Sequence, residues 1–307
     1  MDRTPRSRSV SRSVRNWDNH RMAFDVKLLS ATLAVVLAGC AAPPVPSPAD
    51  ALASAVERRP VVLLGEVHDN EAQHALRAQA LRRLVERGAR PAVAFEQFDR
   101  ERQADLDRAR GSALPAGVAR ADYIAAQAGL AKGWNWNFYR PYLQLALDYD
   151  LPIVAANLSR ADATRVAKQD FSAAFDRSFQ AEHGLDRLSP EFLREHERAV
   201  AIGHCNLMPE SMLPALARAQ IARDLALAMA IRPYIGRGVV LLAGNGHVRN
   251  DIGVPFFLSA DERARAITIG LLEKRAAQTH EPPPPFDVVI LTPVQPREDP
   301  CEKLRRR

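Results

Sequence analysis

Cysteine is scarce in this sequence, and several common catalytic motifs are missing from it. The 307 residues include three cysteines, at positions 40, 205 and 301. The chain has no Walker A loop, no Gly-x-Ser-x-Gly nucleophile elbow and no His-Glu-x-x-His segment. These absences count against three common classes of enzyme. A Cys-x-x-Cys-His segment is also missing, which excludes covalent attachment of a c-type haem.

The body of the chain carries almost no net charge. The whole sequence has a formal net charge of +6, but four of these excess positive charges lie in residues 1–39. Hydrophobic residues make up 47% of the sequence, which is typical of a globular protein. Because bulk nucleic-acid binding needs a basic face that neutralises phosphates, we expect no nucleic-acid partner.

The apolar run over residues 28–39 is too short to cross a membrane but long enough for the core of a signal peptide. It ends in Leu37-Ala38-Gly39-Cys40, which resembles the lipobox of bacterial lipoproteins, where the cysteine thiol receives the lipid. We therefore expect residues 1–39 to be a lipoprotein signal peptide and Cys40 to be the lipidation site. Met22 is an alternative start of translation, and a soluble protein with an apolar N-terminal stub is the alternative interpretation.

A proline-rich stretch predicts a tether between a lipid anchor and a folded body. The tether covers residues 40–49, and residues 50–307 are expected to form a single α/β domain. Residue 41 is Ala rather than the Asp that lipoprotein sorting rules associate with the inner membrane. This implies an outer-membrane lipoprotein of a Gram-negative bacterium that faces the periplasm. In that oxidising compartment, Cys205 and Cys301 either pair or remain free thiols.

Six short apolar runs predict buried strands, because they are apolar on both faces and bounded by turn signals. They cover residues 61–64, 92–95, 153–156, 239–243, 266–269 and 288–291. Helical periodicity lies between them, at residues 71–87, 138–149, 160–168 and 211–231. The alternation predicts an α/β fold with a largely parallel central sheet flanked by helices. Residues 97–137 and 169–210 are expected to be helix-rich insertions.

Polar side chains follow four of these apolar runs. They are Glu66, His68, Glu96, Asn157 and His247. Ligands of open α/β sheets bind beyond the carboxyl ends of the strands, so neighbouring parallel strands would bring these side chains to one rim. Two histidines and two carboxylates suit a borderline divalent metal, so we expect Glu66, His68, Glu96 and His247 to be its ligands and, in a hydrolase, the catalytic residues. Turn and helix-start chemistry is the alternative explanation.

Several motifs occur in a fixed order between residues 56 and 292. They include Gly65-Glu66-Val67-His68, Phe95-Glu96-Gln97-Phe98, Gly203-His204-Cys205-Asn206 and Gly244-Asn245-Gly246-His247. Together they resemble the ChaN family of haem-binding, iron-regulated lipoproteins. The superfamily of ChaN includes the TIKI proteases, in which two Gly-x-x-His motifs and a Glu bind a divalent metal. The resemblance therefore implies a haem carrier, a metal-dependent enzyme, or both.

An aromatic segment at residues 134–142 is a candidate haem-binding element. Two of the three tryptophans lie in it, together with Tyr139, Arg140 and Tyr142. Tyr and His side chains can ligate haem iron. We expect Tyr139 or Tyr142, and otherwise His204, to be the axial ligand, and Arg140 to pair with a propionate. The alternative is that the aromatic side chains anchor a helix to the core.

Other polar residues stand out on predicted helices. His183 and His196 lie among charged residues and are expected to be solvated. Arg223 and Asp224 are adjacent on an otherwise apolar helix. Because a buried Asp without a partner is costly, this pair is expected to form a structural ion pair or to face the site.

Two functions from different classes agree with these observations. The first is a lipid-anchored periplasmic haem-binding protein that takes part in haem or iron uptake, with a homodimer and outer-membrane transport components as candidate partners. The second is a divalent-metal-dependent hydrolase, a peptidase or an esterase, in which a metal-bound water is the nucleophile.

Overall fold

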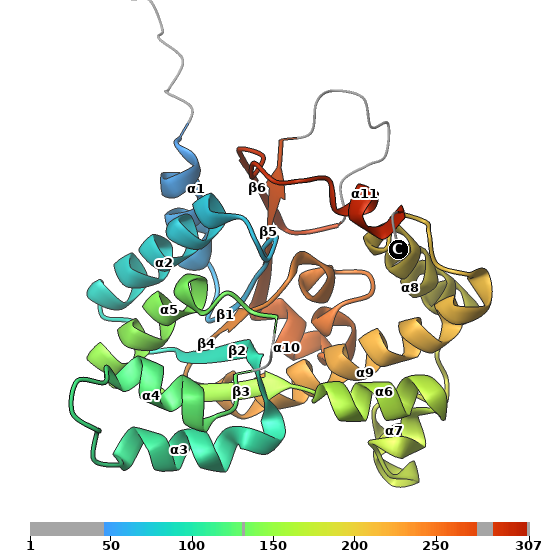
Figure 1. Ribbon diagram of the computed structural model, residues 1–307, viewed down its shortest axis with the longest axis horizontal. Coiled ribbons are helices and arrows are strands. Elements are labelled where there is room, and N and C mark those ends of the chain that lie inside the picture. Colours follow the sequence, from blue (N-terminus) through green and yellow to red (C-terminus); the bar gives the residue numbers. More distant parts are fainter. Residues whose placement is uncertain (1–45, 131–132, 275–284, 306–307) are drawn as a thin grey trace, which may run out of the picture. The chain divides into compact units, whose positions relative to one another are not determined.

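A six-stranded sheet forms the centre of the folded body. The computed structural model describes residues 46–130, 133–274 and 285–305 (Figure 1). The predicted signal peptide and Cys40 lie outside these described residues. These described residues belong to one compact unit.

All six strands run parallel. They are β1 (Val61–Leu64), β2 (Ala92–Asp99), β3 (Ile153–Asn157), β4 (Val239–Leu242), β5 (Ala266–Glu273) and β6 (Val288–Thr292). Their order is β3-β2-β4-β1-β5-β6, and every neighbouring pair is parallel. The predicted fold class, α/β with a largely parallel central sheet flanked by helices, is therefore confirmed.

Helices connect the strands, as parallel pairing requires. The helices before β3 are α1 (Pro48–Val56), α2 (Glu71–Glu86), α3 (Gln103–Gly111), α4 (Arg120–Gln127) and α5 (Trp136–Asp148). The later ones are α6 (Arg160–Lys168), α7 (Arg177–Glu182), α8 (Pro190–Gly203), α9 (Leu213–Ile231), α10 (Ala260–Ala264) and α11 (Pro300–Arg305). The two insertions expected to be helix-rich hold α3 with α4 and α7 with α8.

Alternate residues of strands β1 to β4 contribute to two hydrophobic cores. Val62 and Leu64 of β1 pack with α1 to α5, whereas Val61 and Leu63 pack with the helices from α6 to α9. Side chains of a strand alternate between its two faces, so a strand covered by helices on both sides must be apolar throughout. Figure 1 shows the two groups of helices on opposite sides of the sheet.

Helix α1 was not predicted and α5 begins two residues before its predicted start at residue 138, and local capping explains both. α1 begins at Pro48, inside the predicted tether, because proline is tolerated at the first helical position and Ser47 accepts a hydrogen bond from the Asp50 N–H at 3.2 Å. α5 begins at Trp136 because the Asn135 side chain accepts a hydrogen bond from the Asn137 N–H at 3.2 Å.

Cys205 and Cys301 form a disulfide, with their Cα atoms 5.6 Å apart. Of the two alternatives open at the level of sequence, the structure has the paired form. Within the residues that the structure describes, we find no helix with the length and apolar character needed to cross a bilayer.

Candidate functional site

Four adjacent strands bring the predicted polar residues to one edge of the sheet, which we call the rim. β4 lies between β1 and β2, so the segments that follow β3, β2, β4 and β1 are neighbours. Glu66 and His68 follow β1, and His247 lies in the short helix η5 (Asn245–Val248) after β4. Glu96 is in the last half of β2, and Asn157 ends β3. The predicted convergence is therefore present in the structure.

His68 is the accessible imidazole of this rim. Its side chain is 49% exposed, and its Nδ1 lies 3.0 Å from Oε1 of Glu66. The Cε1 and Nε2 edge of the ring lies against Gly244, where a Cβ atom would be 2.7 Å from Cε1 and 2.9 Å from Nε2. The Trp134 ring stands edge-on to the imidazole at 4.7 Å. The missing side chain at position 244 therefore lets the imidazole lie directly against the backbone of the segment after β4.

Glu66 is the buried carboxylate that holds His68. Its side chain has no exposed surface and forms an ion pair with Arg77, which is itself fully buried. The Tyr139 hydroxyl donates a hydrogen bond to Oε1 at 2.5 Å. Arg77 also donates to the Leu64 carbonyl at 2.9 Å, so it fixes the end of β1 as well as the carboxylate. A buried charge needs such a partner, because desolvation is costly.

His74 completes the group of side chains around Glu66. Its Nδ1 lies 3.5 Å from Oε2 of Glu66, and its Nε2 lies 3.0 Å from the His68 carbonyl oxygen. Burial lowers the pKa of His74 to about 4, so its ring is neutral at physiological pH. A neutral imidazole here stabilises the backbone at His68 without adding charge.

The second half of the rim is organised around His247. Its Nδ1 lies 2.6 Å from Oδ1 of Asp224, and its Nε2 lies 3.5 Å from Oε1 of Glu96. Burial alone would lower the pKa of His247, but the two carboxylates outweigh it and raise that pKa to about 10. The imidazole is therefore a cation between two carboxylates at neutral pH.

Glu96 has further partners that keep it ionised. Its Oε2 accepts a hydrogen bond from the Gly244 N–H at 2.7 Å. Burial opposes ionisation, but the charges of His247 and His68 and the Gly244 N–H lower the pKa of Glu96 to about 2. Asn157 donates to the Glu96 carbonyl at 2.8 Å and accepts from the Arg223 guanidinium at 3.0 Å. Arg223 and Asp224 of α9 thus both face the rim, through Asn157 and His247 respectively.

The four residues predicted to bind haem lie in different surroundings. Tyr139 and Tyr142 have no exposed surface, and the Tyr142 hydroxyl donates to the His74 carbonyl at 2.8 Å. In this structure both phenols are core anchors, because each hydroxyl has an internal acceptor and burial raises the pKa of each. Arg140 lies on the surface of α5 and pairs with Asp122 at 2.5 Å. His204 caps α8, with its Nδ1 2.8 Å from the Val200 carbonyl.

The expectation that His196 is solvated is wrong. This side chain is only 2% exposed and packs edge-on against Phe192, with ring centroids 4.6 Å apart. Burial lowers its pKa to about 4. His196 shares the buried face of α8 with Phe192 and Val200, and the charged residues beside it in the sequence concealed that face.

Sequence reasoning missed Arg77 and His74 as members of the site. They lie three residues apart on α2, and so on one face of that helix. The sequence feature that could have indicated them is an imidazole and a guanidinium on one helix face, in the helix that directly follows Glu66. The sequence indicated that Arg223 and Asp224 are paired or face the site, but it did not indicate that His247 is the partner of Asp224.

The rim as it stands is not arranged as a metal centre. Across the described ranges 46–130, 133–274 and 285–305, no three His, Cys, Asp or Glu side chains are placed to hold a metal ion. The contacts above explain this, because Arg77 neutralises Glu66, while Gly244 and the His247 cation occupy Glu96.

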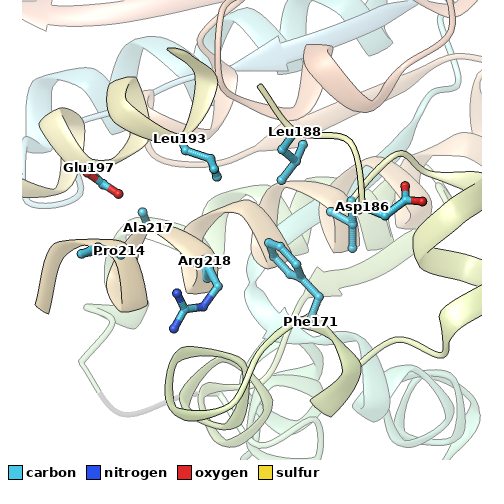
Figure 2. A pocket seen from close by; sticks show the side chains of 9 residues that line it. Phe171, Asp186, Leu188, Leu193, Glu197, Pro214, Ala217 and Arg218 are labelled. Atoms are coloured by element: carbon cyan, nitrogen blue, oxygen red, sulfur yellow. The ribbon is translucent and has the colours of Figure 1, made fainter. Parts of the chain in front are cut away.

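A separate cavity of about 310 Å³ is lined by residues of α8 and α9, by the segment between α7 and α8, and by Phe171 (Figure 2). Its lining is mainly apolar, with three charged side chains, Asp186, Glu197 and Arg218. It includes none of the rim residues.

Comparison with known proteins gives the chain its family. The model of the family described as "Haem-binding uptake, Tiki superfamily, ChaN" matches residues 52–258. Among solved structures, ChaN of Campylobacter jejuni, described as showing cofacial haem binding, is 22% identical and has a TM-score of 0.57. The match covers 70% of this chain and 82% of that one. The identity is low, so this likeness shows a shared fold.

Two further structures are similar at lower scores. The type III effector HopBA1 is 13% identical over 83% of this chain and 97% of its own, with a TM-score of 0.44. A mutant of the erythromycin esterase EreC is 15% identical over 72% of each chain, with a TM-score of 0.41. These scores are too low to support an argument. No protein of curated function matches. Because the family model covers most of the chain, and its motifs occur in order along it, the chain belongs to the haem-binding uptake, Tiki superfamily, ChaN family.

Proposed function

We propose that this chain binds haem at the rim of its sheet and serves haem or iron uptake. Membership of the family supports haem as the ligand. The observation that carries the proposal within the structure is the His68 imidazole, which is half exposed and held at Nδ1 by a buried carboxylate. We assign His68 as the residue that contacts the haem iron.

The residues of the rim fit this group. Histidines that ligate metals usually donate their second ring N–H to a carboxylate, which fixes the tautomer and raises the basicity of the ligating nitrogen. Glu66 accepts from Nδ1 of His68, so Nε2 is the ring nitrogen left for iron, and the close approach to Gly244 sets the position of the ring. The indole of Trp134 adds an apolar wall. When bound, haem would supply an iron centre for axial ligation, while the chain holds and orients it.

The residues predicted from sequence take different parts in this proposal. Tyr139 acts through Glu66, because its hydroxyl donates to that carboxylate. Tyr142 supports His74 from within the core. Arg140 stays the candidate partner for a propionate, which would compete with Asp122 for its guanidinium. His204, Tyr139 and Tyr142 are the alternative iron ligands, and spectra of single variants separate them from His68.

We also propose that the protein is lipidated at Cys40 and faces the periplasm from the outer membrane. The lipobox and the residue after it support this placement, and both lie outside the described part of the structure. Haem has two faces and the rim offers a ligand to one of them, so a homodimer would cover both. The cofacial haem described for Campylobacter jejuni ChaN supports that arrangement. Outer-membrane haem transport components are the corresponding partners for delivery.

A divalent-metal-dependent hydrolase is the second candidate function. The observation in its favour is the orientation of His247 by Asp224, with the other ring nitrogen directed toward Glu96. Against it, His247 is held as a cation, which cannot ligate a metal until it loses its proton. His68, Glu66 and Glu96 would also have to leave their present partners.

One experiment on the full-length protein tests both functions. Ferric haem is titrated into the protein and followed at the Soret band, and bound metal is measured in the same preparation after dialysis. The proposal predicts saturable binding at a fixed stoichiometry. Absence of a saturable Soret change, together with a retained divalent metal and peptidase or esterase turnover that stops in chelator, would overturn it in favour of the hydrolase.

A further inference from the structure

The C-terminal strap, which we define as residues 293–301, joins two distant parts of the fold. It leaves the end of β6, passes the loop after β1, and reaches α11 beside α8, as the red segment in Figure 1 shows. Its last residue, Cys301, is bonded to Cys205 in the loop after α8.

Each of the three residues that follow His68 contacts the strap. Asp69 accepts a hydrogen bond from the Arg297 guanidinium at 2.6 Å. The Asn70 side-chain amide donates to the Pro293 carbonyl at 3.1 Å, and the Glu71 N–H donates to the Gln295 side chain at 3.2 Å. The strap therefore holds residues 69–71 in place. We call these residues the His68 loop.

The strap is also tied to the end of β5. Glu273, the last residue of that strand, accepts from the Gln295 N–H at 3.0 Å and from the Arg297 guanidinium at 2.5 Å. The Asn70 side chain donates to the same carboxylate at 2.7 Å. One carboxylate thus links the sheet, the strap and the His68 loop, so displacement of the strap changes the support of the loop.

The disulfide is the covalent end of this arrangement. Cys205 and Asn206 both have positive φ angles, 59° and 55°, which turn the chain sharply after α8. Terminal segments fray unless they are tied down, and exposed ion pairs such as Arg297 with Asp69 are weak on their own. Closing the strap with a disulfide raises the effective concentration of its polar groups beside their partners.

We propose that the strap is a positioning element for His68, and that thiol–disulfide exchange at Cys205 and Cys301 sets how firmly it acts. A dithiol protein or small dithiol supplies two electrons and two protons. The disulfide becomes two thiols, and the dithiol becomes a disulfide. The oxidised form holds the His68 loop in place, and the reduced form releases it. The consequence for haem affinity rests on the proposed function, whereas the consequence for the loop does not.

The test compares full-length wild type with the double variant Cys205→Ser and Cys301→Ser, so that no reductant meets the haem iron. Hydrogen exchange of the backbone amides at residues 69–71 is measured first, without haem. Soret titration with ferric haem then gives the affinity. We expect faster exchange in the loop and about fivefold weaker haem binding, at the lower end of coupling between sites.

A second variant separates the strap from the general stability of the protein. Arg297→Met removes the ion pairs of the strap with Asp69 and Glu273 but keeps the disulfide, and should also raise exchange at residues 69–71. Arg194→Met, which removes an exposed ion pair with Glu191 on α8, is the matched control and should leave that exchange unchanged.

The outcomes are distinct for the two proposals. Unchanged exchange in the serine double variant overturns the positioning role of the strap. Faster exchange with unchanged haem affinity overturns the coupling to the site. If wild type binds no haem while exchange still rises, the proposed function fails and the positioning role stands.

Discussion

At the scale of single residues, the buried Arg77 is explained by the carboxylate that it neutralises. Glu66 orients the accessible imidazole, so it must stay ionised in the interior, and that requires a cation with no exposed surface of its own. The sequence indicated Glu66, His68, Glu96 and His247 because each follows an apolar run. It did not indicate the cation, because a basic residue on an amphipathic helix is usually solvated. Only the packing of α2 on β1 reveals that Arg77 is buried.

Replacing this cation tests that explanation. Arg77→Met should lower the free energy of unfolding by about 3–5 kcal/mol, because Glu66 is left as an unpaired buried charge. Arg83, on the same helix as Arg77, forms an exposed ion pair with Asp50 of α1, and Arg83→Met should change the free energy of unfolding by less than about 0.5 kcal/mol. Denaturant unfolding measures both variants. Equal effects of the two substitutions would show that Glu66 does not depend on Arg77.

Gly244 gives a second test at the residue scale. Gly244→Ala would place a Cβ 2.7 Å from Cε1 of His68, so the imidazole must move and haem affinity should fall about tenfold or more. Gly246→Ala is the matched control, because a Cβ there meets nothing within 4 Å. Soret titration of both variants, with circular dichroism to check the fold, measures the effect. Equal haem affinity of the two variants would contradict the role given to Gly244.

At the scale of elements, short apolar runs predicted all six strands, whereas the faces of helices were harder to predict. A strand covered on both sides is apolar at every position, so its identification does not depend on periodicity. Tyr139 and Tyr142 show the opposite case, because helical spacing placed them together on α5 without saying whether that face meets a ligand or the core. The core face is the one they occupy, and helix α9 likewise carries Asp224 inward to His247.

The ion pair between Asp224 of α9 and His247 of η5 predicts that stability depends on pH. The pKa of His247 is raised from its ordinary value of 6.5 to about 10 in the folded protein, so its contribution is fully present below pH 6.5 and is lost as pH rises toward 10. The free energy of unfolding of wild type should therefore fall over this range by more than about 1 kcal/mol, the value of one pKa unit. His247→Gln should show a flatter profile. Parallel profiles for the two proteins would mean that the folded state does not hold His247 as a cation.

At the scale of the whole molecule, the sequence predicted the fold class and the rim because both follow from patterns near each strand. The strap and the disulfide could not be predicted in the same way. They join residues far apart in sequence, and no local pattern near Cys205 or Cys301 indicates that the two meet. The family resemblance, confirmed by the match over residues 52–258, narrowed the function beyond what the polar residues alone allowed.

The proposed lipid anchor also belongs to this scale. If Cys40 is the lipid acceptor as proposed, Cys40→Ser should leave the protein unlipidated. The variant should then move from the detergent phase to the aqueous phase in a partitioning assay. Wild type processed in the same cells is the control. A variant that still partitions with membranes as wild type does would place the anchor elsewhere.

The central claim is that His68 contacts haem iron at the rim, and the absorption spectrum of ferric haem tests it most directly. Three full-length proteins are compared: wild type, His68→Ala and Tyr139→Phe. The account predicts that His68→Ala shifts the Soret band and weakens binding by about a hundredfold or more. Tyr139→Phe should keep the wild-type spectrum, because its hydroxyl acts through Glu66. An unchanged spectrum in His68→Ala, or loss of a charge-transfer band in Tyr139→Phe, would contradict the claim.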